Sequence, residues 1–190
     1  MNCEFDRHGA MARAVAFAAY AHDGQERKGT VLPYILHPME TAAIAATMTN
    51  DPDVLAAAML HDVVEDCGVT EGELRSKFGR RVAQLVMAET EEKDPDAQGT
   101  WQRRKLRAIN RLRAATREQM ILTLSDKLSN LRAIDRDLRT LGPELWQRFN
   151  QSNPSMHHWY YASMAEGLKP LEGCDAYQEF LTLLDKVFGP

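Results

Sequence analysis

Four ionisable residues interrupt an otherwise apolar stretch of the chain. The segment LAAAMLHDVVED places His61 and Asp62 directly after a run of small and apolar residues, and Glu65 and Asp66 follow about one helical turn later. Burying such groups without partners is costly, and a divalent cation is a suitable partner because imidazole and carboxylate are good ligands. On a helix Glu65 stands beside both His61 and Asp62, where it is suited to orient or deprotonate a water molecule at the metal. Asp66 is placed for a second contact or for proton transfer.

Two more residues extend this set to a candidate metal site. Asp126 follows the apolar run MILTL, and His37 stands at the start of another expected helix. Together with His61 and Asp62 they offer nitrogen and oxygen ligands and leave positions for water and substrate, as catalytic metals require. An HD dipeptide alone is a weak signal, however, and the alternative is a cluster of helix-capping or salt-bridged groups.

The elements that carry these residues are predicted to be helices. Apolar residues recur at helical spacing along most of the chain, and no stretch longer than a few residues alternates as a strand would. Asp51 and Pro52 mark the start of the helix that carries the chemistry, and Gly68 marks its end. The aromatic residues 159–161 are predicted to pack in the core. We therefore predict an all-α fold of roughly nine or ten helices, at residues 9–22, 37–49, 51–67, from 70 onward, 80–91, 100–117, 118–141, 144–149, 155–171 and 175–188.

Composition limits the class of protein. The chain has 190 residues, 44% hydrophobic and 26% charged, which is enough for one domain with a buried core. No Ser/Gly-rich linker or internal repeat divides it, so a single domain over residues 1–190 is predicted. A net charge of -4 argues against a general nucleic-acid binder. No apolar run reaches the roughly 18 residues of a membrane-spanning helix. Three widely spaced cysteines without a CxxC pair fit a reducing cytoplasm.

Three motifs resemble those of a known family. The segments AHDGQERKGTVLPYILHP, LAAAMLHDVVED and LTLSDKLSNLRAI are similar, in this order, to the signatures of the HD-domain metal phosphohydrolases, specifically the hydrolase domain of the RelA/SpoT homologues. The resemblance covers residues 14–168, and the short architecture is similar to the small alarmone hydrolases. It implies a single HD-type hydrolase domain that removes the 3′-pyrophosphate of ppGpp or pppGpp, giving GDP or GTP and pyrophosphate, with a bound Mn²⁺.

The resemblance also implies roles for individual residues. It assigns the metal ligands to His37, His61, Asp62 and Asp126, the catalytic acidic pair to Glu65 and Asp66, and the nucleotide pocket to Arg27, Lys28 and Asn130. Two departures from the family pattern are visible. Ser125 replaces the usual alanine before the third aspartate, a small change. The loop at residues 150–158 lacks the lysine expected in close relatives, which leaves the phosphate contacts on that side undefined.

A basic stretch follows the acidic loop at residues 89–96. Between Thr100 and Arg117 there are seven lysines or arginines and no acid. Arg104 and Lys105 fit a clamp for the phosphates of the substrate, because a bis-pyrophosphate needs several positive charges around it. An equally weighted alternative is a solvated helix face that pairs with the acidic loop before it.

The substrate and the class of function have alternatives as well. The same metal site could serve adenine alarmones such as ppApp, the 2′-phosphate of NADPH, or a simple nucleotide, because base choice depends on a few hydrogen bonds that the sequence does not reveal. A non-catalytic nucleotide-sensing protein is a further alternative, against which the full set of ligands and both acids argue. The expected partner is a small-molecule nucleotide, and the sequence does not determine the oligomeric state.

Overall fold

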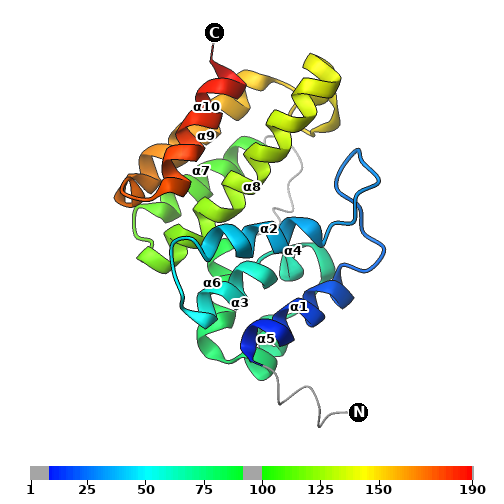
Figure 1. Cartoon of the computed structure of the whole chain (residues 1–190), viewed down its shortest axis with the longest axis vertical. Coiled ribbons are helices and arrows are strands. Elements are labelled where there is room, and N and C mark those ends of the chain that lie inside the picture. Colours follow the sequence, from blue (N-terminus) through cyan, green and yellow to red (C-terminus); the bar gives the residue numbers. More distant parts are fainter. Residues whose placement is uncertain (1–8, 92–99, 190) are drawn as a thin grey trace.

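The computed structural model describes residues 9–91 and 100–189, and its regular structure in these ranges is helical. The predicted all-α fold is confirmed, because the described residues contain ten α-helices, two short 3₁₀ helices and one isolated β-bridge. The elements, labelled in part in Figure 1, are α1 (Ala10–Ala21), α2 (Leu36–Ala45), α3 (Pro52–Leu60), α4 (Val63–Cys67), α5 (Glu71–Phe78), α6 (Arg80–Glu89), α7 (Thr100–Leu112), α8 (Arg117–Leu141), η2 (Gly142–Arg148), α9 (Pro154–Leu168), η3 (Lys169–Leu171) and α10 (Asp175–Phe188).

Local capping explains where the site helices begin. The Asp51 carboxylate accepts a hydrogen bond from the Asp53 amide at 3.0 Å, and Pro52 occupies the first turn of α3. Helix α8 begins with a capping box, in which the Thr116 hydroxyl accepts from the Gln119 amide and the Gln119 side chain accepts from the Thr116 amide. These caps fix the register of the two helices that carry His61 and Asp126.

The prediction of one continuous helix over residues 51–67 is wrong, because the chain breaks at His61 and Asp62 between α3 and α4. In an unbroken helix the Ala58 carbonyl would accept the amide hydrogen of Asp62. Here the His61 side chain takes that carbonyl instead, with Nδ1 2.8 Å from the Ala58 oxygen. A side chain that competes for a helix carbonyl loosens the turn around it. The break therefore comes from one of the candidate ligands.

Other predicted boundaries also differ from the structure. The basic helix expected over 100–117 ends at Leu112, residues 144–149 belong to the 3₁₀ helix η2, and the helix expected over 155–171 divides into α9 and η3. In the acidic loop expected over 89–96, residues 92–96 lie outside the described residues. None of these differences moves a predicted ligand to another part of the fold.

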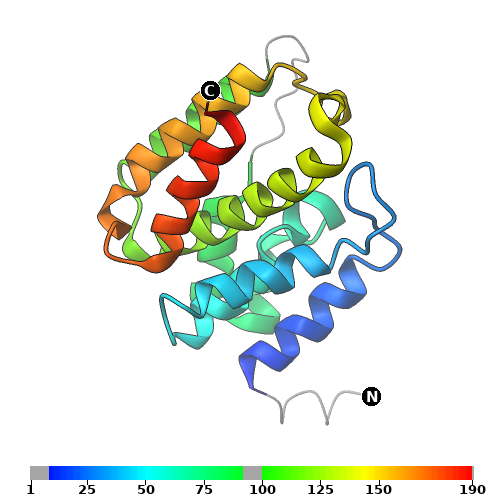
Figure 2. The ribbon, with the colours of Figure 1, turned by 45° about the horizontal axis from the view of Figure 1, so that its top comes forward.

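The helices form two groups joined by the long helix α8. Helix α3 lies centrally in the first group and packs against α1, α2 and α6, while α8 packs against α2 on one side and α10 on the other (Figures 1 and 2). Alanines and leucines of α3 and α8 are fully buried there, which removes apolar surface from water. Helices α2, α3 and α8 also contact one another, so residues from all three meet at one point. Among the described residues no helix combines the length and apolar character needed to cross a bilayer.

Candidate metal centre and adjoining cleft

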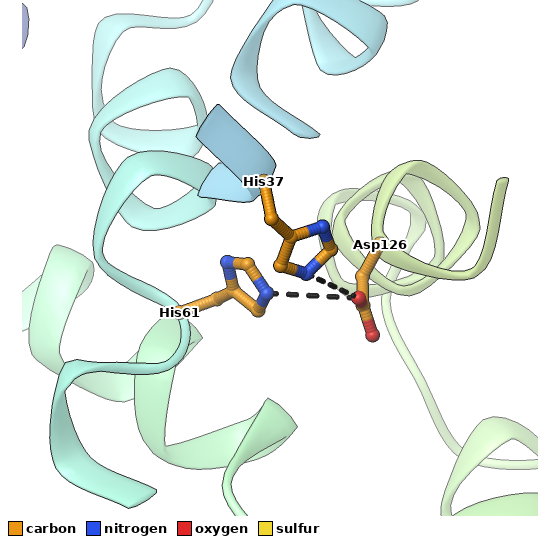
Figure 3. Close-up of side chains that lie close together, drawn as sticks. All are labelled: His37, His61 and Asp126. Carbon is orange, nitrogen blue, oxygen red and sulfur yellow. Dashed lines mark ion pairs between the residues drawn. The ribbon is translucent and has the colours of Figure 1, made fainter. Parts of the chain in front are cut away.

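Three predicted ligands meet where α2, α3 and α8 converge. The imidazoles of His37 and His61 and the carboxylate of Asp126 are buried and point toward one another (Figure 3). Oδ1 of Asp126 lies 3.1 Å from Nε2 of His37 and 3.6 Å from Nε2 of His61. An ion about 2.1 Å from each ligand atom places neighbouring ligands about 3.0 to 3.4 Å apart, so this spacing fits a divalent cation.

The protonation of His61 also fits metal binding. Its Nδ1 faces the Ala58 carbonyl at 2.8 Å, and because a carbonyl only accepts, Nδ1 must carry the hydrogen. Nε2 is buried without a hydrogen-bond partner and is directed at the other two ligands. Buried polar atoms are normally satisfied, so this nitrogen is a candidate ligand, which offers its lone pair to a cation once it has lost its proton.

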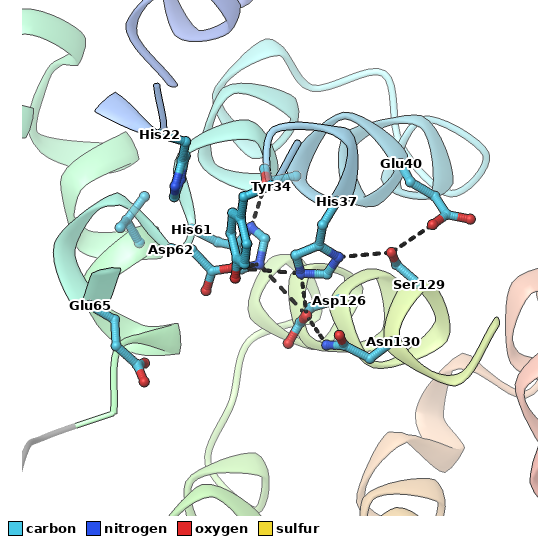
Figure 4. A network of polar contacts seen from close by, with 12 residues as sticks. His22, Tyr34, His37, Glu40, His61, Asp62, Glu65, Asp126, Ser129 and Asn130 are labelled. Atoms are coloured by element: carbon cyan, nitrogen blue, oxygen red, sulfur yellow. Dashed lines mark hydrogen bonds and ion pairs between the residues drawn. The ribbon is translucent and has the colours of Figure 1, made fainter. Parts of the chain in front are cut away.

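His37 is oriented by a chain of hydrogen bonds that the sequence does not reveal. The buried Ser129 hydroxyl donates to Oε2 of Glu40 at 2.8 Å, and its oxygen lies 2.9 Å from Nδ1 of His37 (Figure 4). Since the hydroxyl hydrogen is committed to Glu40, Nδ1 of His37 must donate to Ser129. Nε2 then presents its lone pair to the cluster, and such outer contacts are typical of metal-binding histidines.

The fourth predicted ligand, Asp62, lies beside the cluster. Its Oδ2 is 3.0 Å from Nε2 of His61 and 3.5 Å from Nε2 of His37. The same oxygen accepts a hydrogen bond of 2.6 Å from the Tyr34 hydroxyl. The structure thus groups His37, His61 and Asp126 most tightly, with Asp62 next to both histidines and held by Tyr34. The motifs do not single out Tyr34, although its position three residues before His37 is a usable signal.

The buried charges at the centre stabilise one another. Although burial favours neutral groups, the carboxylates of Asp62 and Asp126 raise the pKa of His61 well above its ordinary value. Burial lowers the pKa of His37, which is therefore held neutral. Against the effect of burial, the Lys127 ammonium beside Asp126 and the two imidazoles hold the pKa of that carboxyl well below its usual range. A cation binds neutral imidazoles and ionised carboxylates, so metal binding at this centre releases the proton that the two carboxylates favour on His61.

The two predicted catalytic acids occupy different environments. Glu65 lines the small cavity of about 180 Å³ that contains the ligands, and its Oε2 accepts from the Glu91 amide at 3.3 Å. Burial and the nearby Glu91 carboxylate raise the pKa of Glu65. Asp66 is exposed near the end of α4 and is absent from the described lining of this cavity. The structure therefore brings Glu65 into the metal cavity and places Asp66 beside it, where partial burial and the Asp62 carboxylate raise the pKa of Asp66.

Arg104 and Lys105 reach the same cavity from α7. Lys105 Nζ lies 2.6 Å from one oxygen of Glu91, and Arg104 Nη1 lies 3.5 Å from the other. Burial alone would raise the pKa of Glu91, but the Lys105 charge lowers it and keeps this carboxylate ionised. Both predicted interpretations of the basic stretch thus have a basis, because the cations line the cavity and also pair with an acid that precedes them.

A larger cleft of about 340 Å³ adjoins the metal cavity, and four residues, Tyr34, Lys105, Lys127 and Asn130, line both. Arg27 and Lys28 line the cleft as well; Arg27 donates to Oδ1 of Asn130 at 2.9 Å and Lys28 donates to Asn150 at 2.8 Å. Two of the three aromatic residues 159–161 are buried as predicted and also face this cleft, together with Trp101, Phe149 and His157. The cleft is therefore aromatic and cationic, as a nucleotide site would be.

Comparison with known families accounts for this arrangement. The model of the HD domain matches residues 14–154. The chain belongs to the HD domain family. This membership explains the pairing of His61 with Asp62 and confirms the family predicted from the three motifs.

Individual relatives are similar over different shares of their length. A Danio rerio protein named guanosine-3′,5′-bis(diphosphate) 3′-pyrophosphohydrolase MESH1 is 34% identical over 184 residues, which cover 93% of this chain and 91% of the relative. A Vibrio cholerae guanosine-3′,5′-bis(diphosphate) 3′-pyrophosphohydrolase is 47% identical over 77 residues, and the match spans only 11% of that longer protein. The solved structure of a metazoan ortholog of SpoT that hydrolyses ppGpp has a TM-score of 0.77 at 24% identity and covers 96% of this chain and 98% of its own. That structure supports the shared fold.

Proposed function

We propose that this HD-domain protein is a metal-dependent hydrolase that removes the 3′-pyrophosphate of ppGpp and pppGpp. The observation that carries the proposal is the candidate metal centre opening directly into a cationic, aromatic cleft. The nearly full-length similarity to a relative named for this reaction supports it. The predictions of one hydrolase domain over residues 1–190 and of a cytoplasmic location stay predictions.

The proposed metal is Mn²⁺, held by His37, His61 and Asp126 with Asp62 as the fourth ligand. A mixed set of imidazole and carboxylate ligands accepts Mn²⁺ and other transition ions, whereas Mg²⁺ prefers sites built from oxygen alone. When bound, such a cation supplies a Lewis acid and makes a water molecule more acidic near neutral pH. The unpartnered Nε2 of His61 and the oriented Nε2 of His37 support this assignment.

The remaining site residues act on water and phosphate. Water adds to the phosphorus attached to the 3′ oxygen, and the bond from this phosphorus to the 3′ oxygen breaks. The 3′ oxygen takes up the proton that the attacking water loses, so GDP or GTP leaves with a 3′ hydroxyl and pyrophosphate leaves with the oxygen of the water. Glu65 accepts the proton from the water, a role that its raised pKa and its position in the metal cavity support. Lys105 and Arg104 leave the Glu91 carboxylate, bind the departing pyrophosphate instead and balance the negative charge of this leaving group. Arg27, Lys28 and Asn130 bind the nucleotide, and the role of Asp66 in proton transfer stays a prediction.

Release of pyrophosphate by the purified protein tests the proposal. With Mn²⁺ present, we expect release from ppGpp, and parallel assays with ppApp, NADPH and mononucleotides decide between the alternative substrates. Glu65→Gln should lose most of the rate and keep the metal, whereas His61→Ala should lose the metal. Wild-type rates in Glu65→Gln would refute the role of Glu65. Binding of nucleotides without turnover of any of them would instead indicate a nucleotide sensor.

A further inference from the structure

The cleft has two chemically different ends, and helix α8 connects them. One face of α8 carries four residues at helical spacing: Asp126, Asn130, Ile134 and Asp137. Asp126 lines the metal cavity, and the other three line the cleft. A helix rises about 1.5 Å per residue, so Asp137 lies about 16 Å along the axis from Asp126. A nucleotide whose 3′ group reaches the metal centre therefore extends along α8 toward Asp137.

Three cations line the outer end of the cleft. Lys28 comes from the loop before α2, Arg136 from α8 and Arg148 from η2. Asp137 is the one carboxylate among the described residues that line the cleft, and its oxygens lie 3.3 Å from nitrogens of Arg136 and Arg148. One carboxylate against three cations leaves this end positively charged.

The position of Arg148 is defined by more than this ion pair. Its aliphatic stem crosses the loop before α2 at Gly29, which has a φ of 73°. A Cβ at Gly29 would come within 2.6 Å of Cδ of Arg148, so the glycine makes room for the arginine. The Arg148 side chain is only 25% exposed and stays in the cleft. An arginine held in this way loses little conformational freedom when it binds an anion.

We propose that the outer end of the cleft, formed by Lys28, Arg136 and Arg148, binds phosphate groups on the 5′ oxygen of the nucleotide. This inference rests on the proposed function, which places the 3′ pyrophosphate at the metal centre. It selects nucleotides that carry phosphate at both ends over those with a free 5′ hydroxyl. Arg148 and Arg136 also supply positive charge near the loop at 150–158, where the sequence lacks the expected lysine.

Binding of GDP and of guanosine to the Mn²⁺-loaded protein, measured by calorimetry, tests this subsite without any turnover. GDP keeps the 5′ phosphates and has no 3′ pyrophosphate, so the difference between the two affinities reports binding of the diphosphate, and the Arg148 variants assign it to the outer end. We expect GDP to bind more tightly than guanosine. Arg148→Gln should weaken GDP binding about tenfold, the low end for a lost charge-assisted contact, with guanosine binding unchanged. Arg148→Lys, which keeps the charge, should fall between the wild type and Arg148→Gln.

A matched control is Arg75→Gln, which removes one arginine from the exposed surface of α5 and should leave both affinities unchanged. Equal affinities of the wild type for GDP and guanosine would overturn the inference. The inference would also be overturned if Arg148→Gln lost affinity for GDP and for guanosine equally while its unfolding temperature stayed unchanged. If ppGpp is not hydrolysed but the GDP results hold, the proposed function fails and the phosphate subsite stands. If ppGpp is hydrolysed but GDP binds no more tightly than guanosine, the proposed function stands and the subsite fails.

Discussion

Replacing Ser129 by alanine is expected to weaken metal binding while the fold persists. Ser129 is only 1% exposed and connects Nδ1 of His37 to Glu40 through hydrogen bonds of 2.9 and 2.8 Å. Without the hydroxyl, the buried Nδ1 of His37 loses its partner, which costs about 1–3 kcal/mol. The imidazole is then free to carry its hydrogen on Nε2, the atom that faces Asp126.

The size of the effect follows from the same contacts. Loss of an outer-shell partner of a metal-binding histidine typically weakens metal affinity about 10–100-fold, which is ~1.4–2.7 kcal/mol. Titration of the metal-free protein with Mn²⁺ in a calorimeter measures this affinity directly. Glu40→Gln keeps an acceptor for the Ser129 hydroxyl and should cause a smaller loss than Ser129→Ala.

Ser125→Ala is the matched control for this prediction. Ser125 is also fully buried on α8, one turn before Ser129, but its hydroxyl donates to the Ile121 carbonyl at 2.7 Å within the helix. The substitution is identical and removes no contact with His37, so Mn²⁺ affinity should match that of the wild type. If Ser129→Ala also binds Mn²⁺ as tightly as the wild type, the hydrogen-bond chain does not orient His37 and the reasoning is refuted.

Three further predictions concern pH, metal and stability. Burial and the Glu91 carboxylate raise the pKa of Glu65, so as pH falls Glu65 loses its ionised form at a higher pH than an ordinary glutamate does. Glu91→Gln should therefore move the acid limb of the pH profile of kcat/KM to lower pH. An unmoved acid limb would mean that this limb reports the titration of another group. Removal of metal by EDTA should abolish hydrolysis, and Mn²⁺ should restore it better than Mg²⁺ because two of the ligands are imidazoles. Hydrolysis by protein shown to be free of metal would contradict the assignment of a catalytic metal to this site. Phe180→Ala should lower the free energy of unfolding, measured by urea titration, by about 3–5 kcal/mol because Phe180 is fully buried. Leu106→Ala, at a position that is 43% exposed, should have little effect. Equal losses of stability in the two variants would mean that α10 does not cover the core.

The sequence predicts the ligands better than the groups that orient them. His61 and Asp126 are conspicuous because ionisable residues follow apolar runs on core helices, and burial of such groups demands a partner. Ser129 gives no comparable signal, since serine is common on helices and its role depends on Glu40, which lies 89 residues away in the chain. Long-range hydrogen bonds of this kind require the packing of α2 on α8, which residue spacing alone does not specify.

The helix ends show the same division between local and tertiary causes. Asp51 and Pro52 mark the start of α3 by local chemistry, so the sequence predicts that start correctly. The sequence does not predict the break after Leu60, because a run of good helix formers leads up to it and no glycine or proline marks it. What ends α3 is the His61 imidazole turning back to the Ala58 carbonyl, a rotamer that suits the metal centre. The functional role of His61 thus overrides the helical propensity of the segment.

The basic stretch on α7 illustrates why two interpretations of a sequence can both have a physical basis. A cavity lined by Lys105 and Arg104 needs a counter-charge when no anionic ligand is present, and Glu91 supplies it through contacts of 2.6 and 3.5 Å. A phosphate that enters the cavity replaces one anion with another, so the cations need not move far.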